Sequence, residues 1–223
     1  MKRRKLGAAA ILLGLIASPV AAAKAPVEWD GLRQVSSKRM DLVYLQPGAD
    51  FRGYTKVIVD PTEVSFRKNW QKDYNRGSRD LGGKVSDRDV QDAIAKGVVA
   101  ASDIFTETWR RGGYEIANQP GPDVLRVKTA VANISVNAPD VRSSARSYSF
   151  SEEAGQATLV IEVRDSLTGA ILGRAIDQAI VGYNSATWRT TVSNRADFRQ
   201  VVEGWAKNGV RGMTELKALS PIR

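Results

Sequence analysis

The stretch from Gln156 to Val181 constrains the fold more than any other, because it spells two strands joined by a turn. Apolar residues occupy every second position from Leu159 to Val163, which is the period of a strand with one buried face. The segment Asp165 to Gly169 contains the Asp, Ser and Gly types that close a hairpin. Ala170 to Val181 is apolar enough for a central strand. We therefore predict a hairpin at the centre of a sheet.

Two long amphipathic helices are predicted, one before and one after this hairpin. Ser86 and Asp89 have the spacing of a capping box, and Gly112-Gly113 marks the end of the first helix. Its expected buried stripe consists of Val90, Ile94, Val98, Ala101, Phe105 and Trp109. Asn194 is expected to cap the second helix, with a buried face formed by Phe198, Val201, Val202, Trp205, Met213 and Leu216. Gly204, Gly209 and Gly212 weaken this helix but could permit a close approach to the sheet.

The remaining β-branched segments complete the sheet. Strands are predicted around Leu42 to Leu45, Tyr54 to Asp60 and Leu125 to Val136, with a bulge near Ala132 or Asn133 where the apolar alternation changes phase. The predicted fold class is α+β: a two-layer sandwich of a mostly antiparallel sheet with two long helices on one face.

Two long polar segments are predicted to be loops, Gln71 to Lys84 and Asn137 to Gly155. Loops of this length in a compact domain are commonly either functional or loosely ordered. They carry the Tyr, Phe and Arg types that are enriched at protein interfaces. The candidate interaction residues are Tyr74, Arg76, Arg79, Arg142, Arg146, Tyr148 and Phe150.

The N-terminus has the pattern of a secretory signal peptide. Lys2 to Lys5 form a basic region, Leu6 to Ile16 an apolar core, and Ala21 and Ala23 a small-residue cleavage site. An uncleaved membrane anchor is the alternative, but the apolar core is shorter than the ~20 residues that span a bilayer. We expect a signal peptide at residues 1–23 and a single α+β domain at residues 24–223. General export would make this domain a soluble periplasmic protein without a transmembrane segment.

Composition excludes several classes of function. The chain has no histidine and no cysteine, which removes Ser-His-Asp and Cys-His catalysis, imidazole or thiolate metal sites, and disulfides. Of the formal net charge of +9, the bases of the leader contribute four, and the rest are spread along the chain without a basic run. We therefore predict no nucleic-acid binding, no cofactor, no metal site and no identifiable catalytic residue.

Carboxylates are the remaining candidates for chemistry. A glycosidase needs two of them about 5 to 10 Å apart across a bond, a geometry that sequence cannot establish. The candidates are Asp60, Glu63, Glu152, Glu153 and Asp165, all of which also fit turn or capping positions on a solvated surface. Trp70, Trp188, Tyr148 and Tyr183 could stack on a sugar or a partner, although single aromatics of this kind more often border the core.

Several short segments together resemble one bacterial family. They are Val43 to Phe51, Tyr54 to Pro61, Gly113-Tyr114, Asn137 to Asp140, Ala154 to Leu159 and Asp165 to Gly169. In this order they resemble the uncharacterised domain of unknown function 3313, over most of the chain that follows the leader. The resemblance implies an exported protein, often labelled a lipoprotein, but supplies no catalytic residues. Because no Cys follows the leader, a lipid anchor is not expected here.

Two hypotheses of function follow, from different classes. The first is a non-enzymatic binding or assembly module of the cell envelope, with an envelope protein or a cell-wall component as its partner. The second is an envelope hydrolase that works through carboxylates. Convergent acids in a deep pocket would favour the hydrolase, whereas an apolar patch or a flat sheet edge would favour the binding module.

Overall fold

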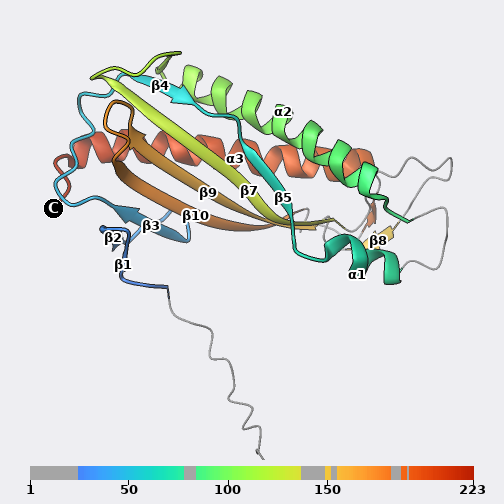
Figure 1. Ribbon diagram of the computed structural model, residues 1–223. Helices are drawn as coiled ribbons and strands as arrows, with labels where there is room; N and C mark the ends of the chain where they lie inside the picture. Colours follow the sequence, from blue (N-terminus) through green and yellow to red (C-terminus); the bar gives the residue numbers. More distant parts are fainter. Residues whose placement is uncertain (1–24, 78–83, 137–148, 152–154, 182–186, 190) are drawn as a thin grey trace, which may run out of the picture.

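The computed structural model describes residues 25–77, 84–136, 149–151, 155–181, 187–189 and 191–223 (Figure 1). The predicted signal peptide, residues 1–23, therefore lies outside the described residues. The strands are β1 (Glu28–Trp29), β2 (Leu32–Val35), β3 (Leu42–Leu45), β4 (Lys56–Val59), β5 (Glu63–Phe66), β6 (Glu115–Ile116), β7 (Val124–Val136), β8 (Ser149–Ser151), β9 (Gly155–Asp165), β10 (Ile171–Val181) and β11 (Thr187–Arg189). The helices are α1 (Trp70–Gly77), α2 (Asp87–Arg111) and α3 (Thr191–Leu219).

The predicted hairpin forms the centre of the main sheet, as expected. The strand order is β1-β2-β3-β10-β9-β7-β4-β6, with β5 also paired to β7, so β9 and β10 have strands on both sides. In the turn, the Asp165 carboxylate accepts from the backbone N–H of Thr168 at 2.7 Å, and Gly169 takes a φ of 73°. The Asp and Gly therefore serve in the turn as the sequence predicts.

The α+β class is confirmed, and the main sheet is mixed, with antiparallel pairs in the majority and parallel pairs at one edge. The strands from β1 to β7 in the spatial order pair antiparallel, whereas β4 pairs parallel to β7 and β6, and β5 pairs parallel to β7. The reason is the connection through α2, because a strand that returns to the same sheet after a helical crossover runs parallel to the strand before it. A third, short helix, α1, also precedes α2.

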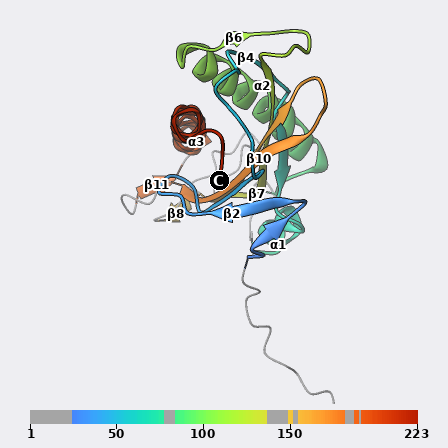
Figure 2. The same cartoon turned by 90° about the vertical axis from the view of Figure 1, so that its left-hand side faces the viewer.

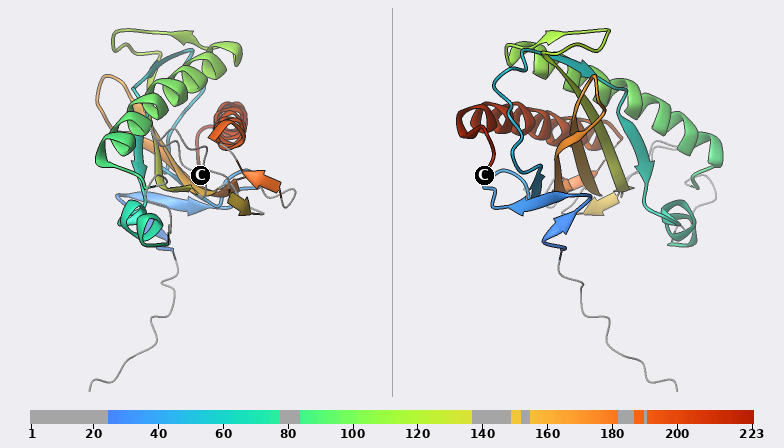
Figure 3. Two further views of the ribbon diagram at one scale, coloured as in Figure 1. Left: turned by 90° about the vertical axis from the view of Figure 1, so that its right-hand side faces the viewer. Right: turned by 60° about the vertical axis from the view of Figure 1, so that its left-hand side comes forward.

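Both long helices lie on one face of the main sheet (Figures 2 and 3). Between them and the sheet lies the core, which includes Phe51, Phe105, Trp109, Leu125, Leu159 and Trp205. Gly209 lets α3 approach the sheet, since a Cβ there would lie 3.2 Å from Cδ1 of Ile161. No such close contact exists at Gly204 or Gly212, so the predicted role of the helix glycines holds at one position of three.

A cluster of charged side chains lies on the opposite face of the sheet. Arg174, whose side chain is 9% exposed, donates to Glu162 at 2.7 Å and to Asp30 at 3.0 Å. Its guanidinium also lies 4.0 Å from the ring centre of Trp29. Burial alone would raise the pKa of Glu162, but hydrogen bonds from Arg174 and Arg164 outweigh it and keep the pKa below its ordinary value. This cluster joins the β1–β2 hairpin to the sheet.

Three predicted boundaries differ from the structure. The predicted loop Gln71 to Lys84 begins as helix α1, and the predicted loop Asn137 to Gly155 contains β8, which pairs with β11. The closing helix begins at Thr191, before the predicted cap Asn194. Tertiary packing explains α1, because Phe66 stacks on Trp70 with ring centres 4.5 Å apart and Tyr74 lies 6.0 Å from Trp70. Within the described ranges, no helix is both long enough and apolar enough to cross a membrane.

Candidate functional site

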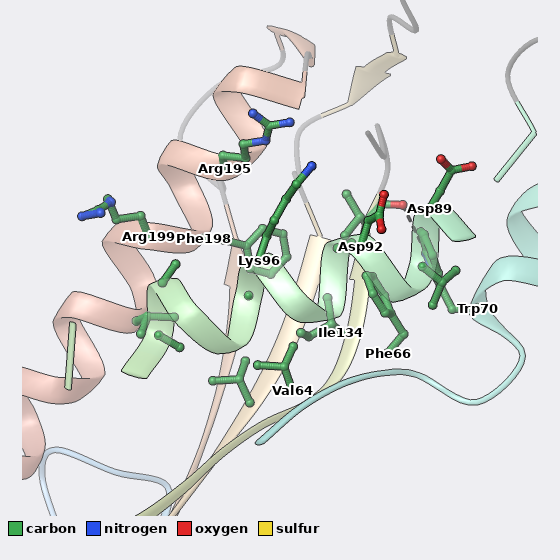
Figure 4. A pocket seen from close by; sticks show the side chains of 18 of the residues that line it. Val64, Phe66, Trp70, Asp89, Asp92, Lys96, Ile134, Arg195, Phe198 and Arg199 are labelled. Atoms are coloured by element: carbon green, nitrogen blue, oxygen red, sulfur yellow. Dashed lines mark hydrogen bonds between the residues drawn. The ribbon is translucent and has the colours of Figure 1, made fainter. Parts of the chain in front are cut away.

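The candidate site is an elongated apolar pocket between α2, α3 and the sheet (Figure 4). Its volume is about 500 Å³, which lies within the range of about 300 to 1,000 Å³ that is typical of small-molecule sites. It lies beside the N-terminal halves of both long helices, which start at the same end of the molecule (Figure 1).

The floor of the pocket depends on the predicted bulge in β7. Val131 and Ile134 are both buried and line the pocket, although a regular strand would place residues three apart on opposite faces. The register shifts between Ala132 and Ser135, and Asn133 takes a φ of 53°. The extra residue restores the apolar side chains to the helix face. Without it, the polar side chain of Asn133 would face the pocket.

One end of the pocket is formed by the aromatic pair Phe66 and Trp70. The Trp70 indole N–H donates to the carbonyl oxygen of Val136 at 3.2 Å, which satisfies its polar atom and fixes the ring across the end of β7. Both rings and Val136 line the pocket. Trp70, which the sequence identified as a possible stacking residue, is therefore part of an apolar wall.

The wall contributed by α2 includes a run of small residues. Ala93, Gly97, Ala100 and Ala101 line the pocket along the helix. A Cβ at Gly97 would lie 3.2 Å from Cγ1 of Val64, so the helix comes close to β5 at that point. Small side chains along the rest of this face leave volume that larger ones would fill. The helix is thus close to the sheet at Gly97, and the small side chains beside it leave the space of the pocket.

The wall contributed by α3 is formed by Phe198 and Val202. Phe198 packs over Gly155, where a Cβ would lie 3.1 Å from the phenyl ring and 1.9 Å from the carbonyl oxygen of Ser135. Only glycine allows β7, β9 and the Phe198 ring to meet at this point. The position of this wall therefore depends on a residue in the strand beneath it.

Charged side chains form the rim. Lys96 from α2 and Arg195 and Arg199 from α3 line the pocket and are exposed, and Asp92 lies beside them, partly buried. Figure 4 shows Lys96 and Arg195 pointing to the same side, away from Val64 and Ile134. Arg199 also lies 3.6 Å from Glu203, one turn later on α3. The pocket therefore has an apolar interior and a charged, mainly basic opening.

The pocket offers little for catalysis. Its lining has no serine, threonine or tyrosine among the described residues, and Asp89 is engaged in the capping box, where it accepts from the Ser86 backbone N–H at 2.9 Å and hydroxyl at 2.6 Å. The described part of the chain holds no group of three or more acidic residues that could bind a metal ion.

The predicted carboxylates do not line this pocket. Asp60 is paired with Arg126 at 2.8 Å, and Asp165 accepts from the backbone of the turn and from the Tyr54 hydroxyl at 2.8 Å. The backbone hydrogen bond from Thr168, with further hydrogen bonds from Tyr54 and Leu167, holds the pKa of Asp165 below its ordinary value, the opposite of what a general acid needs. Glu63 is exposed, and Glu152 and Glu153 lie outside the described residues.

The predicted interaction residues are only partly described. Tyr74 and Arg76 lie on α1 rather than in a loop, with Tyr74 beside Trp70 and Arg76 3.8 Å from Asp73. Phe150 lies in β8, opposite Trp188 in β11. Arg79, Arg142, Arg146 and Tyr148 lie outside the described residues.

Sequence reasoning did not identify the pocket. Two signals were present, the small residues along one face of α2 and the two arginines one turn apart on α3. Neither signal is specific, because alanines are common in helices and exposed arginines are common on surfaces. Their meaning appears only when the fold brings the two helices together.

Comparison with known proteins gives a family and distant structural similarities. The profile of the DUF3313 family, described as a protein of unknown function, matches residues 23–208. No match is found among curated proteins.

Three solved structures illustrate the structural similarities. A DUF330 protein from Xanthomonas campestris is 10% identical with a TM-score of 0.39, over 78% of this chain and 91% of that one. The PelC dodecamer from Paraburkholderia phytofirmans is 14% identical with a TM-score of 0.33, over 73% and 96%. A putative neuraminyllactose-binding hemagglutinin homolog from Helicobacter pylori is 13% identical with a TM-score of 0.32, over 78% and 92%. Similarities this low identify no ligand and no partner for this chain.

Proposed function

Because this chain belongs to the DUF3313 family of proteins of unknown function, we propose its function from the pocket: it is a non-enzymatic binding protein of the cell envelope that holds an apolar ligand between α2, α3 and the sheet. Export to the periplasm is part of this proposal, and it rests on the leader pattern in residues 1–23.

The single observation that carries the proposal is the pocket itself. An elongated cavity of about 500 Å³, lined by valine, isoleucine, alanine and aromatic side chains, lies among otherwise close-packed elements. Burial of apolar ligand surface there contributes roughly 25 cal/mol per Å² before the cost of association. Polar ligands are disfavoured in the interior, because their groups would lose hydrogen bonds to water without replacement.

The carboxylate hydrolase is the weaker alternative. Convergent acids in a deep pocket would have favoured it, whereas the pocket is apolar and its buried acid, Asp89, is engaged in capping α2. The predicted interaction with an envelope protein or a cell-wall component is not tested by the pocket and stays a prediction. Its residues are Tyr74, Arg76, Arg79, Arg142, Arg146, Tyr148 and Phe150.

The test is binding of a neutral fluorescent probe, N-phenyl-1-naphthylamine, to the mature protein purified without detergent. We expect saturable binding with increased fluorescence. Ala93→Phe, which places a large ring in the pocket, should weaken binding at least about tenfold, because the ring occupies ligand volume. The matched control is Ala95→Phe, since Ala95 is exposed and does not line the pocket.

Two outcomes would contradict the proposal. One is the absence of probe binding by the wild-type protein. The other is equal binding by Ala93→Phe and Ala95→Phe when both variants keep the wild-type thermal midpoint. Val136→Trp fills the aromatic end of the same pocket from β7. If it also weakens probe binding, the effect of Ala93→Phe comes from lost pocket volume and not from a local change in α2.

A further inference from the structure

We propose that the ligand of this pocket is a single-chain amphiphile with an anionic head, its hydrocarbon chain in the apolar interior and its head at the basic rim. This inference rests on the proposed binding function and narrows it to one chemical class. Its grounds are the shape of the pocket, the separation of apolar and charged groups within it, and the charges on the two facing helices.

The shape of the pocket fits an extended hydrocarbon chain. Its lining on α2 runs from Asp89 to Ile104, which at 1.5 Å per residue corresponds to about 22 Å. A cavity of about 500 Å³ that runs along this length of helix is elongated, and an extended hydrocarbon chain fits along it.

The chemistry of the lining divides the pocket into two zones. Sheet residues such as Val64, Val131 and Ile134 offer only hydrocarbon surface, and the aromatic end is closed by Phe66 and Trp70. The charged ends of Lys96 and Arg195 lie together on the other side, away from this floor (Figure 4). A ligand that satisfies both zones has an apolar body and a polar head. A purely apolar ligand would use only the first zone.

The balance of charge at the rim favours an anion. Three basic groups line the opening, Lys96, Arg195 and Arg199, against the partly buried Asp92 and the capping residue Asp89. Glu203 and Asp197 lie nearby on α3, and Glu203 shares Arg199 at 3.6 Å. Among the residues that line the pocket, the three bases therefore outnumber the two acids, while Glu203 and Asp197 lie outside the lining. Its bases come from two different helices, so that a carboxylate or phosphate head can contact both.

Helix direction adds to this preference. Both α2 and α3 begin at the pocket end of the molecule (Figure 1), and a helix N-terminus carries a partial positive charge. Asp87 and Asp89 in the first turn of α2 offset that charge, whereas the first turn of α3 has no acidic residue. Arg195 and Arg199 thus lie on the helix whose N-terminal charge is not offset within its own first turn.

The experiment compares four ligands that share one chain and differ only in the head. Dodecanoate, dodecyl phosphate, dodecanol and dodecyltrimethylammonium are each used to displace N-phenyl-1-naphthylamine from the wild-type protein below their micellar concentrations. We expect both anions to bind at least about fivefold tighter than dodecanol, and the cation to bind more weakly. The two anions distinguish a carboxylate head from a phosphate head. The preference should decrease as salt is added, because exposed charges are screened.

Substitutions at the rim test whether its basic residues cause the preference for anionic ligands. Lys96→Gln combined with Arg199→Gln should bring the affinity for both anions to within about twofold of that for dodecanol, and leave dodecanol itself unchanged, because only the head contacts change. The matched control is Lys207→Gln, since Lys207 is an exposed base of α3 that does not line the pocket. Circular dichroism and the thermal midpoint verify that each variant is folded.

The outcomes separate this inference from the function on which it rests. If dodecanol displaces the probe as well as the anions do, the pocket binds apolar chains and the anionic head is wrong. An anion preference that survives in the double rim variant, or in Ala93→Phe, would also overturn the inference, because the anion would then bind elsewhere. If neither the probe nor any of the four ligands binds, the proposed function itself fails.

Discussion

The two halves of α2 share one apolar stripe but differ in what they contact. In the C-terminal half, Phe105 and Trp109 are 0% and 1% exposed and belong to the core. In the N-terminal half, Val90, Ile94 and Val98 are only partly buried, and the pocket lies alongside. Periodicity in the sequence predicts the same burial for both halves, so the prediction is correct for one half and too strong for the other.

The difference comes from how α3 meets α2. Near the end of α2, a Cβ at Gly112 would lie 2.4 Å from a methyl carbon of Val210, so the two helices touch there. Figure 3 shows α2 crossing α3 obliquely, with its N-terminal end farther away. Helix α2 thus packs fully where the helices meet and borders a pocket where they diverge, and of the three partly buried stripe residues only Val90 lines that pocket. An amphipathic pattern shows which face turns inward, but not whether the space behind that face is filled.

The largest expected effect tests the packed half directly. Phe105→Ala should lower the free energy of unfolding by about 3 to 5 kcal/mol, because it removes a fully buried ring and leaves a cavity. Ile94→Ala in the open half should cost much less, about 1 kcal/mol or below, since the side chain is only partly buried. Urea unfolding measures both. A cost below about 1 kcal/mol for Phe105→Ala would show that this half is not packed as described.

The next effect concerns the tight contact beneath the open half. Gly155→Ala should cost about 2 to 3 kcal/mol, because its Cβ would lie 1.9 Å from the Ser135 carbonyl oxygen and the strands must separate. The matched control is Gly204→Ala on α3, where a Cβ meets nothing within 4 Å. That change should raise stability by about 0.5 to 1 kcal/mol through helix propensity. Equal midpoints in thermal unfolding for the two variants would contradict the close approach at Gly155.

The smallest expected effect concerns Glu162, on the face of the sheet opposite the two long helices. The pKa of Glu162 is below its ordinary value in the fold, so its ionised form stabilises the protein at neutral pH. That contribution is present above the pKa of the unfolded chain, about 4.3, and is lost as the pH falls through the lower folded value. Glu162→Gln should therefore reduce stability at neutral pH by about 1 kcal/mol and flatten its decline on acidification.

Urea midpoints measured at neutral pH and near pH 3 follow this decline. Glu63→Gln, which changes an exposed carboxylate of β5 in the same way, serves as the control. An unchanged decline in Glu162→Gln would show that the contacts of Glu162 with Arg174 and Arg164 do not stabilise the fold.

Local signals in the sequence were reliable where a few neighbouring residues decide the structure. The capping box of Ser86 and Asp89 forms as predicted, Gly169 closes the hairpin, and the bulge lies at Asn133. Each depends on hydrogen bonds or backbone angles within a few residues, which the sequence specifies directly. The family, too, could be recognised from short motifs, and residues 23–208 match it.

Tertiary contacts decided the rest. The parallel pairing of β4 and β5 with β7 depends on where the chain re-enters the sheet after α2, and α1 depends on the stacking of Trp70 with Phe66. The pocket likewise requires Gly97, Phe198 and Ile134, residues far apart in the chain, to meet at one place. A sequence specifies local hydrogen bonds and the apolar face of each element, but the volume left between packed elements depends on the angle at which they meet. The sequence by itself therefore determined the elements and their inward faces, and only the tertiary structure decided that two of those faces diverge to leave a pocket.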